Sequence, residues 1–366
     1  MAFAVTDVEP IDREMARAKH PIEDRIIGKP DIDAQYERLR AASDPAEGLF
    51  GPGSVMWQLI EPLPVVPFML VQAGFIEGAV PKIWFGTEYT INRFGDFESR
   101  FHRSGDSFYT WFVGDVDQAL RRGRKIHGYH SRVGGVVPTD IGDVKEGQEY
   151  RATEQELLFL TVLTQVIPIK YIYEALVRQL TPAEIDRYWE ECKVFAQVFG
   201  IEPELLPKTW ADMEAYWERA ITSGHMEAPA EGYSRYGPLL DQSVMPFVAR
   251  WVVRWLISVQ YNMLDDRIRS WFAPHIALAK RRPVLRWATV GVLRLALRVL
   301  PDSVTSVPRV RAARRRVGST AKPGRAERWM ASHLAHPYGD KLPSLAIPAS
   351  AATDPDNSKA LRLPPV

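Results

Sequence analysis

Residues 153–168, TEQELLFLTVLTQVIP, decide the fold class of this chain. Thr153 followed by Glu156 is a capping-box pattern and predicts the start of a helix. From Leu157 to Ile167 this helix is apolar on nearly every face, which is typical of a helix at the centre of a fold. Pro168 is expected to kink or end it.

Helix signals of the same kind lie on both sides of this stretch. Capping-box pairs predict three further helix starts, at Asp115–Gln118, Thr181–Glu184 and Thr209–Asp212. Gly200 and Gly224 predict helix ends. Few stretches alternate apolar and polar residues, so a sheet is not expected. We therefore predict an all-α protein, a single large helical domain with flexible termini.

Composition changes mark three parts of the 366-residue chain. Residues 1–47 are charged and poor in large apolar residues, which predicts an N-terminal arm with short helices. Residues 48–318 carry the helical pattern and form the predicted catalytic or binding domain. Residues 319–366 are rich in Ala, Pro and Ser, as is typical of a flexible tail.

The overall composition excludes several classes of protein. An apolar fraction of 46% with 25% charged residues is that of a globular protein. The single cysteine, Cys192, cannot form an internal disulfide, which favours a reducing, cytoplasmic setting. No signal peptide is expected at the N-terminus. The apolar stretches 54–76 and 284–300 are interrupted by prolines or arginines, so neither predicts a spanning helix.

Charge is distributed unevenly although the net charge is only +1. Residues 276–325 hold 13 basic side chains and one acid, Asp302. This segment can face an anionic membrane at the inner face of the cell, or the acidic remainder of the chain. Peripheral membrane contact is expected through 284–316. Nucleic acid is not an expected partner, because no aromatic residues are interleaved with the charges of 309–316.

Common catalytic signatures are absent from the sequence. It has no phosphate loop, dinucleotide fingerprint, nucleophile elbow or Cys-x-x-Cys, and no histidine follows a glutamate at Glu-x-x-His spacing. Two His-x-x-His pairs remain, His127/His130 and His333/His336. The second pair lies in the weakly patterned tail.

The first pair has helical spacing. His130 falls within an apolar stripe with Gly123, Ile126 and Val133, and His127 lies about 60° further round the helix. A histidine that faces a core needs a partner for its ring nitrogens. Three partners stay open: a hydrogen-bond acceptor, a metal ion held by both histidines, or a haem iron held by one.

The preceding helix carries an aromatic stripe, with polar residues along its edge. Arg100 and Ser104 stand one turn apart there. An arginine at the margin of an aromatic core either reaches solvent or donates hydrogen bonds to a cofactor or to bound oxygen. Cys192 is not expected to be a thiolate ligand, because two glutamates precede it directly.

Four stretches taken in order are similar to the family that joins the fungal MpaB oxygenases and the latex-clearing rubber oxygenases. They are Arg100-Phe101-His102-Arg103-Ser104, His130-Ser131-Arg132-Val133-Gly134-Gly135, Tyr150-Arg151-Ala152 and Phe199-Gly200-Ile201 through to Leu206-Pro207-Lys208-Thr209. The resemblance covers residues 48–318. The chain departs from many members at Leu160-Thr161-Val162, where they have Trp-Val-His.

This resemblance implies a helical fold that encloses one haem b. The histidine of the His-x-x-Val-x-Gly stretch is the iron ligand in rubber oxygenases, which implies that role for His130. Arg100 and Ser104 would line the distal side as catalytic residues. Arg103 replaces the distal lysine of rubber oxygenases; it remains a candidate contact to the haem, although a protonated guanidinium is a poor iron ligand.

The function implied by the resemblance is a haem-dependent oxygenase. With dioxygen as co-substrate, it would act on a lipophilic, unsaturated, isoprenoid-like substrate, by oxidative cleavage of a C=C bond. The alternative is a non-enzymatic helical protein that binds or carries a lipid, with His130 as a hydrogen-bonded core residue. Colour of the purified protein separates the two.

Overall fold

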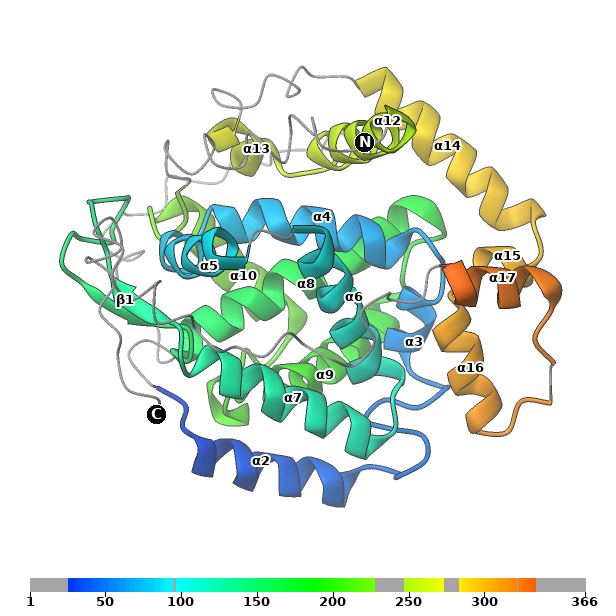
Figure 1. Cartoon of the computed structure of the whole chain (residues 1–366), viewed down its shortest axis with the longest axis horizontal. Helices are drawn as coiled ribbons and strands as arrows, with labels where there is room; N and C mark the ends of the chain where they lie inside the picture. Colours follow the sequence, from blue (N-terminus) through cyan, green and yellow to red (C-terminus); the bar gives the residue numbers. More distant parts are fainter. Residues whose placement is uncertain (1–25, 95–96, 228–246, 273–282, 321, 334–366) are drawn as a thin grey trace.

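The computed structural model describes residues 26–94, 97–227, 247–272, 283–320 and 322–333. In these ranges the chain consists of helices and one short antiparallel hairpin, so the all-α prediction is confirmed (Figure 1). The helices are α2 (Lys29–Ala42), α3 (Val55–Ile60), α4 (Val65–Gly78), α5 (Pro81–Phe94), α6 (Phe97–Val113), α7 (Val116–His130), α8 (Gln155–Leu176), α9 (Pro182–Val198), α10 (Trp210–Thr222), α12 (Phe247–Tyr261), α13 (Asp266–Phe272), α14 (Pro283–Val299), α15 (Asp302–Thr305), α16 (Pro308–Arg316) and α17 (Arg325–His333). A 3₁₀ turn, η1, spans Pro203–Leu205, and the strands are β1 (Gly134–Val136) and β2 (Glu149–Arg151).

Helix α8 is the central helix, as its sequence predicts. It is buried on nearly all faces and packs against α3, α4, α9 and α14. Its two buried charges, Lys170 and Glu174, pair with each other at 3.0 Å, one turn apart. An apolar helix enclosed in this way is stabilised by packing rather than by one amphipathic face.

Two details of α8 differ from the sequence prediction. The N-cap is Glu154 rather than Thr153, because Lys82 pairs with the Glu154 carboxylate at 2.8 Å and the Arg151 amide donates to it. The helix also continues through Pro168 to Leu176. Buried residues precede and follow Pro168, so packing on both sides outweighs the cost of the proline.

By length and composition α8 could cross a membrane, but 78% of its most apolar window is buried inside the protein. The bent pair of α4 and 81–87 passes the same test when its 109° break is ignored. Within the described ranges these are the helices that meet the criterion. Their burial and the bend are those of core helices in a helical body.

Helices α6 and α7 form an antiparallel hairpin beside this core (Figure 1). Asp106 of α6 pairs with Arg122 of α7 at 2.6 Å, which fixes how the two helices align. Helix α2 packs across α7 and α9, with Tyr36 fully buried. Part of the predicted arm is therefore a packed helix, while residues 1–25 lie outside the described ranges.

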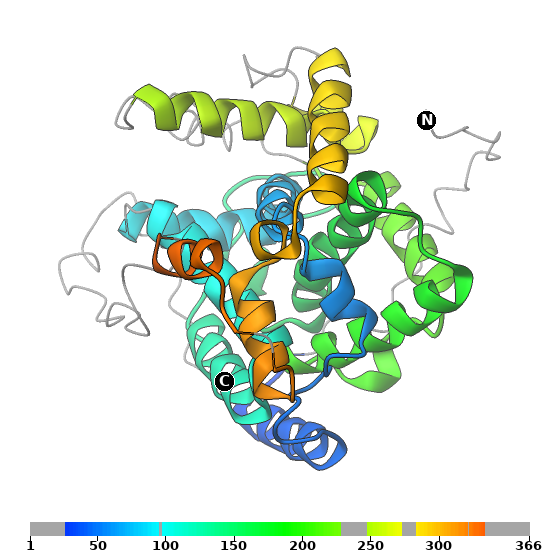
Figure 2. The same cartoon turned by 90° about the vertical axis from the view of Figure 1, so that its right-hand side faces the viewer.

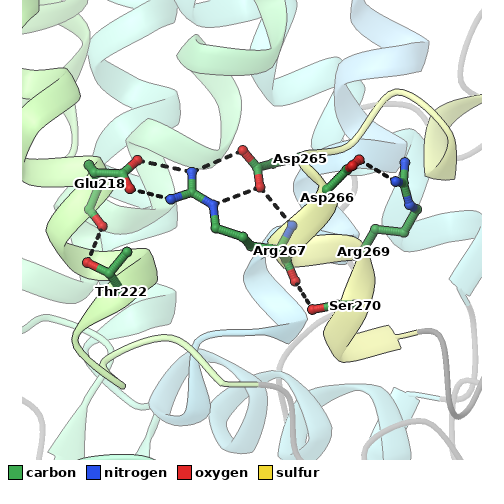
Figure 3. A network of polar contacts seen from close by, with 7 residues as sticks. All are labelled: Glu218, Thr222, Asp265, Asp266, Arg267, Arg269 and Ser270. Carbon is green, nitrogen blue, oxygen red and sulfur yellow. Dashed lines mark hydrogen bonds and ion pairs between the residues drawn. The ribbon is translucent and has the colours of Figure 1, made fainter. Parts of the chain in front are cut away.

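Helices α12 and α14 form an outer layer on one side of the molecule, as both views show (Figures 1 and 2). Helix α12 packs on α4, and α14 packs on α8 and α12. The segment after α12 is tied to α10, where Arg267 pairs with Glu218 and also with Asp265 at 3.0 Å (Figure 3). Helices α16 and α17 pack together next to α6.

Candidate functional site

Helix α7 carries the candidate ligand His130 as its last residue. The predicted capping box at its start is confirmed, because the Asp115 side chain accepts from the Gln118 amide at 2.7 Å and the Gln118 side chain accepts in return. The helix end is equally defined, with the Val133 amide donating to the His130 carbonyl at 2.9 Å. Local sequence thus fixes where the imidazole stands on the helix.

The stretch from His130 to Gly135 continues from the helix end through a turn into β1. There Gly135 pairs with Tyr150 of β2, and the Ala152 amide donates to the Val133 carbonyl at 3.0 Å. A β-carbon at Gly135 would lie 3.2 Å from the Tyr150 hydroxyl. The second and third of the four family-like stretches are therefore neighbours in the structure. The short hairpin joins them.

A small pocket lies beside the histidines, between α6, α7 and the end of α9. Its lining is mostly apolar and consists of Trp111, Gly123, Ile126, His127, His130, Val198 and Phe199. The cavity volume is about 10 Å³, which is room for about one water molecule. Phe199 opens the fourth family-like stretch, so this stretch also meets the second at the pocket.

His127 and His130 both face this pocket, which differs from the prediction that His130 alone lies in the apolar stripe. His127 is the more buried ring, at 8% exposed, and His130 is half-buried. The reason is that α7 packs against α2 as well as α6, which widens its buried face. Among the described residues, His127 Nε2 has no hydrogen-bond partner. Burial lowers the pKa of His127, so its ring is neutral at pH 7.

The residues predicted on α6 are placed along the helix as follows. Arg103 is half-buried, and Ser104 is exposed rather than enclosed. Arg100 lies on the first turns of α6, with its side chain outside the described part. The Asp106–Arg122 pair aligns the hairpin, so the rise per residue places the backbones of Arg100 and His130 at the same end of it, about 9 and 12 Å from that pair.

Other predicted positions are not at this pocket. Cys192 is fully buried, and burial raises the pKa of its thiol, which agrees with the prediction that it is not a thiolate ligand. The side chains of His333 and His336 lie outside the described part of the chain. Of the predicted aromatic stripe, Phe108 and Phe112 are buried in the core.

The chemistry of the site suits one axial ligand better than a multi-residue metal site. Within the described ranges no group of three or more His, Cys, Asp or Glu side chains could hold a metal ion. A haem iron needs a single imidazole from the protein, and a half-buried histidine beside aromatic walls supplies one. The cavity between the described side chains is too small for a porphyrin, so these residues alone do not enclose one.

Sequence reasoning missed the second group of buried ionisable residues, around His225. Its Nδ1 lies 3.2 Å from Asp143 and its Nε2 lies 3.2 Å from Glu156. Burial opposes the ring's charge, but the two carboxylates outweigh it and raise the pKa of His225 to about 10. The three residues come from distant segments, so no local spacing indicates the cluster.

Comparison with protein families identifies the helical body. Residues 57–301 match the family described as ER-bound oxygenase mpaB/B′/rubber oxygenase, catalytic domain. No curated protein and no solved structure matches the chain. Because the match spans most of the chain and includes the hairpin, the pocket and the central helix, this protein belongs to the MpaB/rubber oxygenase family and carries its oxygenase catalytic domain.

Proposed function

We propose that this protein is a haem b-dependent oxygenase that oxidises a lipophilic, unsaturated, isoprenoid-like substrate, with His130 as the iron ligand. The family supports oxygenase activity. The observation that carries the finer assignment is the position of His130, at the edge of an apolar pocket and at the same end of the α6–α7 hairpin as Arg100.

The haem would supply activation of dioxygen, which side chains alone do not provide. The chain's own residues would bind and orient. Neutral His130 offers one ring nitrogen to the iron. Arg100 would donate hydrogen bonds where negative charge develops on oxygen, with Ser104 in a lesser role because it is exposed. Arg103 would support the haem from the same helix.

The substrate class follows from the walls of the pocket. Trp111, Ile126 and Phe199 offer apolar contact and few groups that could anchor a polar molecule. Cleavage of a C=C bond in which both atoms of one dioxygen become two carbonyl groups needs no further electron donor. A reducing, cytoplasmic setting belongs to the proposal, since the one cysteine is free and buried.

Spectroscopy of the purified protein tests the proposal. We expect a Soret band that reaches one haem per chain after hemin is added. His130→Ala should lose the band, and added imidazole should restore it in part, because a free imidazole can occupy the vacated position. The matched variant is His127→Ala, on the same helix and the same pocket, which should retain the band.

Two results would contradict the proposal at different points. A His130→Ala protein that still holds stoichiometric haem excludes His130 as the ligand. A wild-type protein that is colourless and takes up no hemin excludes haem, and the lipid carrier then becomes the better reading. Far-UV circular dichroism of each variant controls for loss of folding.

A further inference from the structure

Helix α14 presents its apolar side chains outwards. Most of the large exposed apolar side chains in the described part of the chain lie on α14 or α12. On α14 they are Val284, Trp287, Val292, Leu295 and Val299; on α12 they are Trp251 and Trp255. Trp287 is 52% exposed and Leu295 is 61% exposed. The spacing of the α14 set is that of one helix face, so it forms a continuous stripe along the helix.

Polar groups of α14 are turned towards the protein instead. Arg286 donates to the Asn262 carbonyl at 3.0 Å, and Arg294 donates to the Ala175 carbonyl. Thr289 is buried and accepts from the Trp255 indole at 3.2 Å. A surface helix of a globular protein normally has the opposite arrangement. The stripe is therefore exposed although the helix is firmly held.

The layer that carries the stripe is anchored to the body. Gln72 of α4 donates to Gln260 of α12 at 2.9 Å. Beyond α12, Arg267 bridges Asp265 and Glu218 of α10 (Figure 3). Both views show α12 and α14 as the outermost helices on their side (Figures 1 and 2). The exposed stripe thus belongs to a fixed surface.

The charge of this surface has one sign. Residues 247–262 and 283–300 contain no acidic side chain, whereas Arg254, Arg294 and Arg298 are exposed on α12 and α14. Apolar side chains with tryptophans and flanking arginines suit the boundary between lipid headgroups and acyl chains. Anionic headgroups complement the arginines.

Helix α16, the second half of the basic segment, is engaged differently. Arg309 pairs with Asp106, and Arg314 pairs with Glu61 at 2.6 Å. Arg311 and Arg315 both pair with buried Glu327. These arginines are matched by acids of the body, so the surface available to a membrane is confined to α12 and α14.

We propose that the α12–α14 surface binds the surface of a lipid bilayer that contains anionic lipids. The Trp287–Leu295 stripe inserts among the acyl chains, and the arginines contact headgroups. This inference does not depend on haem or on oxygenase activity. It adds a route for a lipophilic substrate, which would be dissolved in the same bilayer.

Vesicle flotation tests the proposal with the full-length protein. We expect the wild type to float with phosphatidylcholine vesicles that contain phosphatidylglycerol, and to float less with pure phosphatidylcholine or at high salt. Trp287→Glu with Leu295→Glu should weaken binding more than tenfold, because two anchoring side chains are lost and two repelling charges are gained. The matched control is Trp329→Glu on α17, since Trp329 is 60% exposed but lies away from the layer.

Fluorescence gives an independent readout. Brominated lipids should quench the tryptophan emission of the wild type, and Trp287→Phe should lose part of that quenching. Equal binding to neutral vesicles would overturn the assignment to anionic lipid. Equal loss in Trp329→Glu would overturn the assignment to α14. Absence of flotation, with a wild-type dimer that the double variant dissociates, would overturn the proposal and make a second copy of the chain the occupant.

Discussion

The hydroxyl group of Tyr36 crosses α7 at Gly123, where a β-carbon would overlap it. This hydroxyl donates to the Val198 carbonyl at 2.7 Å, so one side chain of α2 joins α7 to the end of α9. Gly123 and Val198 both line the pocket beside His130. The packing of α2 is therefore connected to the geometry of the candidate site.

We predict that Gly123→Ala destabilises the protein by about 1 to 3 kcal/mol, because an added methyl group must displace Tyr36 or the α7 backbone. The control is Gly128→Ala, in the same helix, where a β-carbon meets nothing within 4 Å. That change should stabilise by about 0.5 to 1 kcal/mol through helix propensity. Urea unfolding followed by circular dichroism measures both, and effects of the same sign would contradict the prediction.

Asp106 holds three helices together, since it pairs with Arg122 of α7 and with Arg309 of α16. We predict that Asp106→Ala lowers the free energy of unfolding by about 3 kcal/mol, because two guanidinium groups lose a largely buried partner. Asp117 is the matched control: it also contacts two arginines, Arg40 and Arg121, but it is exposed. Asp117→Ala should change the urea midpoint little. Similar losses in the two variants would show that burial does not decide the effect.

The sequence predicts helix starts better than it predicts burial. The capping boxes at Asp115, Thr181 and Thr209 are all present, because the side chain and the amide that form each box are three residues apart. The same reasoning fails at Thr153, where an ion pair from Lys82, far away in sequence, holds Glu154 at the helix start. Tertiary contacts of this kind leave no local signal.

Candidate site residues show the same division. His130, the half-buried end of α7, could be proposed from spacing and family resemblance. The equal approach of His127 could not, because it depends on where α2 packs. The β1–β2 hairpin was likewise not expected, since strands of three residues are too short to show alternation. The apolar stripe of α14 is visible in the sequence, but only the structure shows that it faces outwards.

Cys192 serves as a probe of global unfolding. It is the only cysteine in the chain and is fully buried, and burial raises the pKa of its thiol. We predict that a thiol reagent such as DTNB labels the native protein only very slowly and labels one thiol per chain at once in concentrated guanidinium chloride. Rapid labelling of the native protein would show that this part of the core opens readily.

His225 provides a prediction of pH dependence. Its pKa is raised from 6.5 to about 10 in the folded protein by Asp143 and Glu156, despite the opposing effect of burial. A group with a raised folded pKa contributes stability that is fully present below its unfolded pKa and is lost as the pH rises through the folded value. We therefore expect the free energy of unfolding to fall, by on the order of 2 kcal/mol, between about pH 6.5 and pH 10.

The two buried histidines should differ in the sign of this effect. His225→Gln should remove most of the decrease on the alkaline side. His127 has a lowered pKa because of burial, so the stability linked to it is lost as the pH falls below about 6.5. His127→Gln should therefore flatten the acidic side and leave the alkaline decrease in place. Urea unfolding curves from pH 5 to about pH 10 decide this, and an alkaline decrease that persists in His225→Gln would assign it to another group.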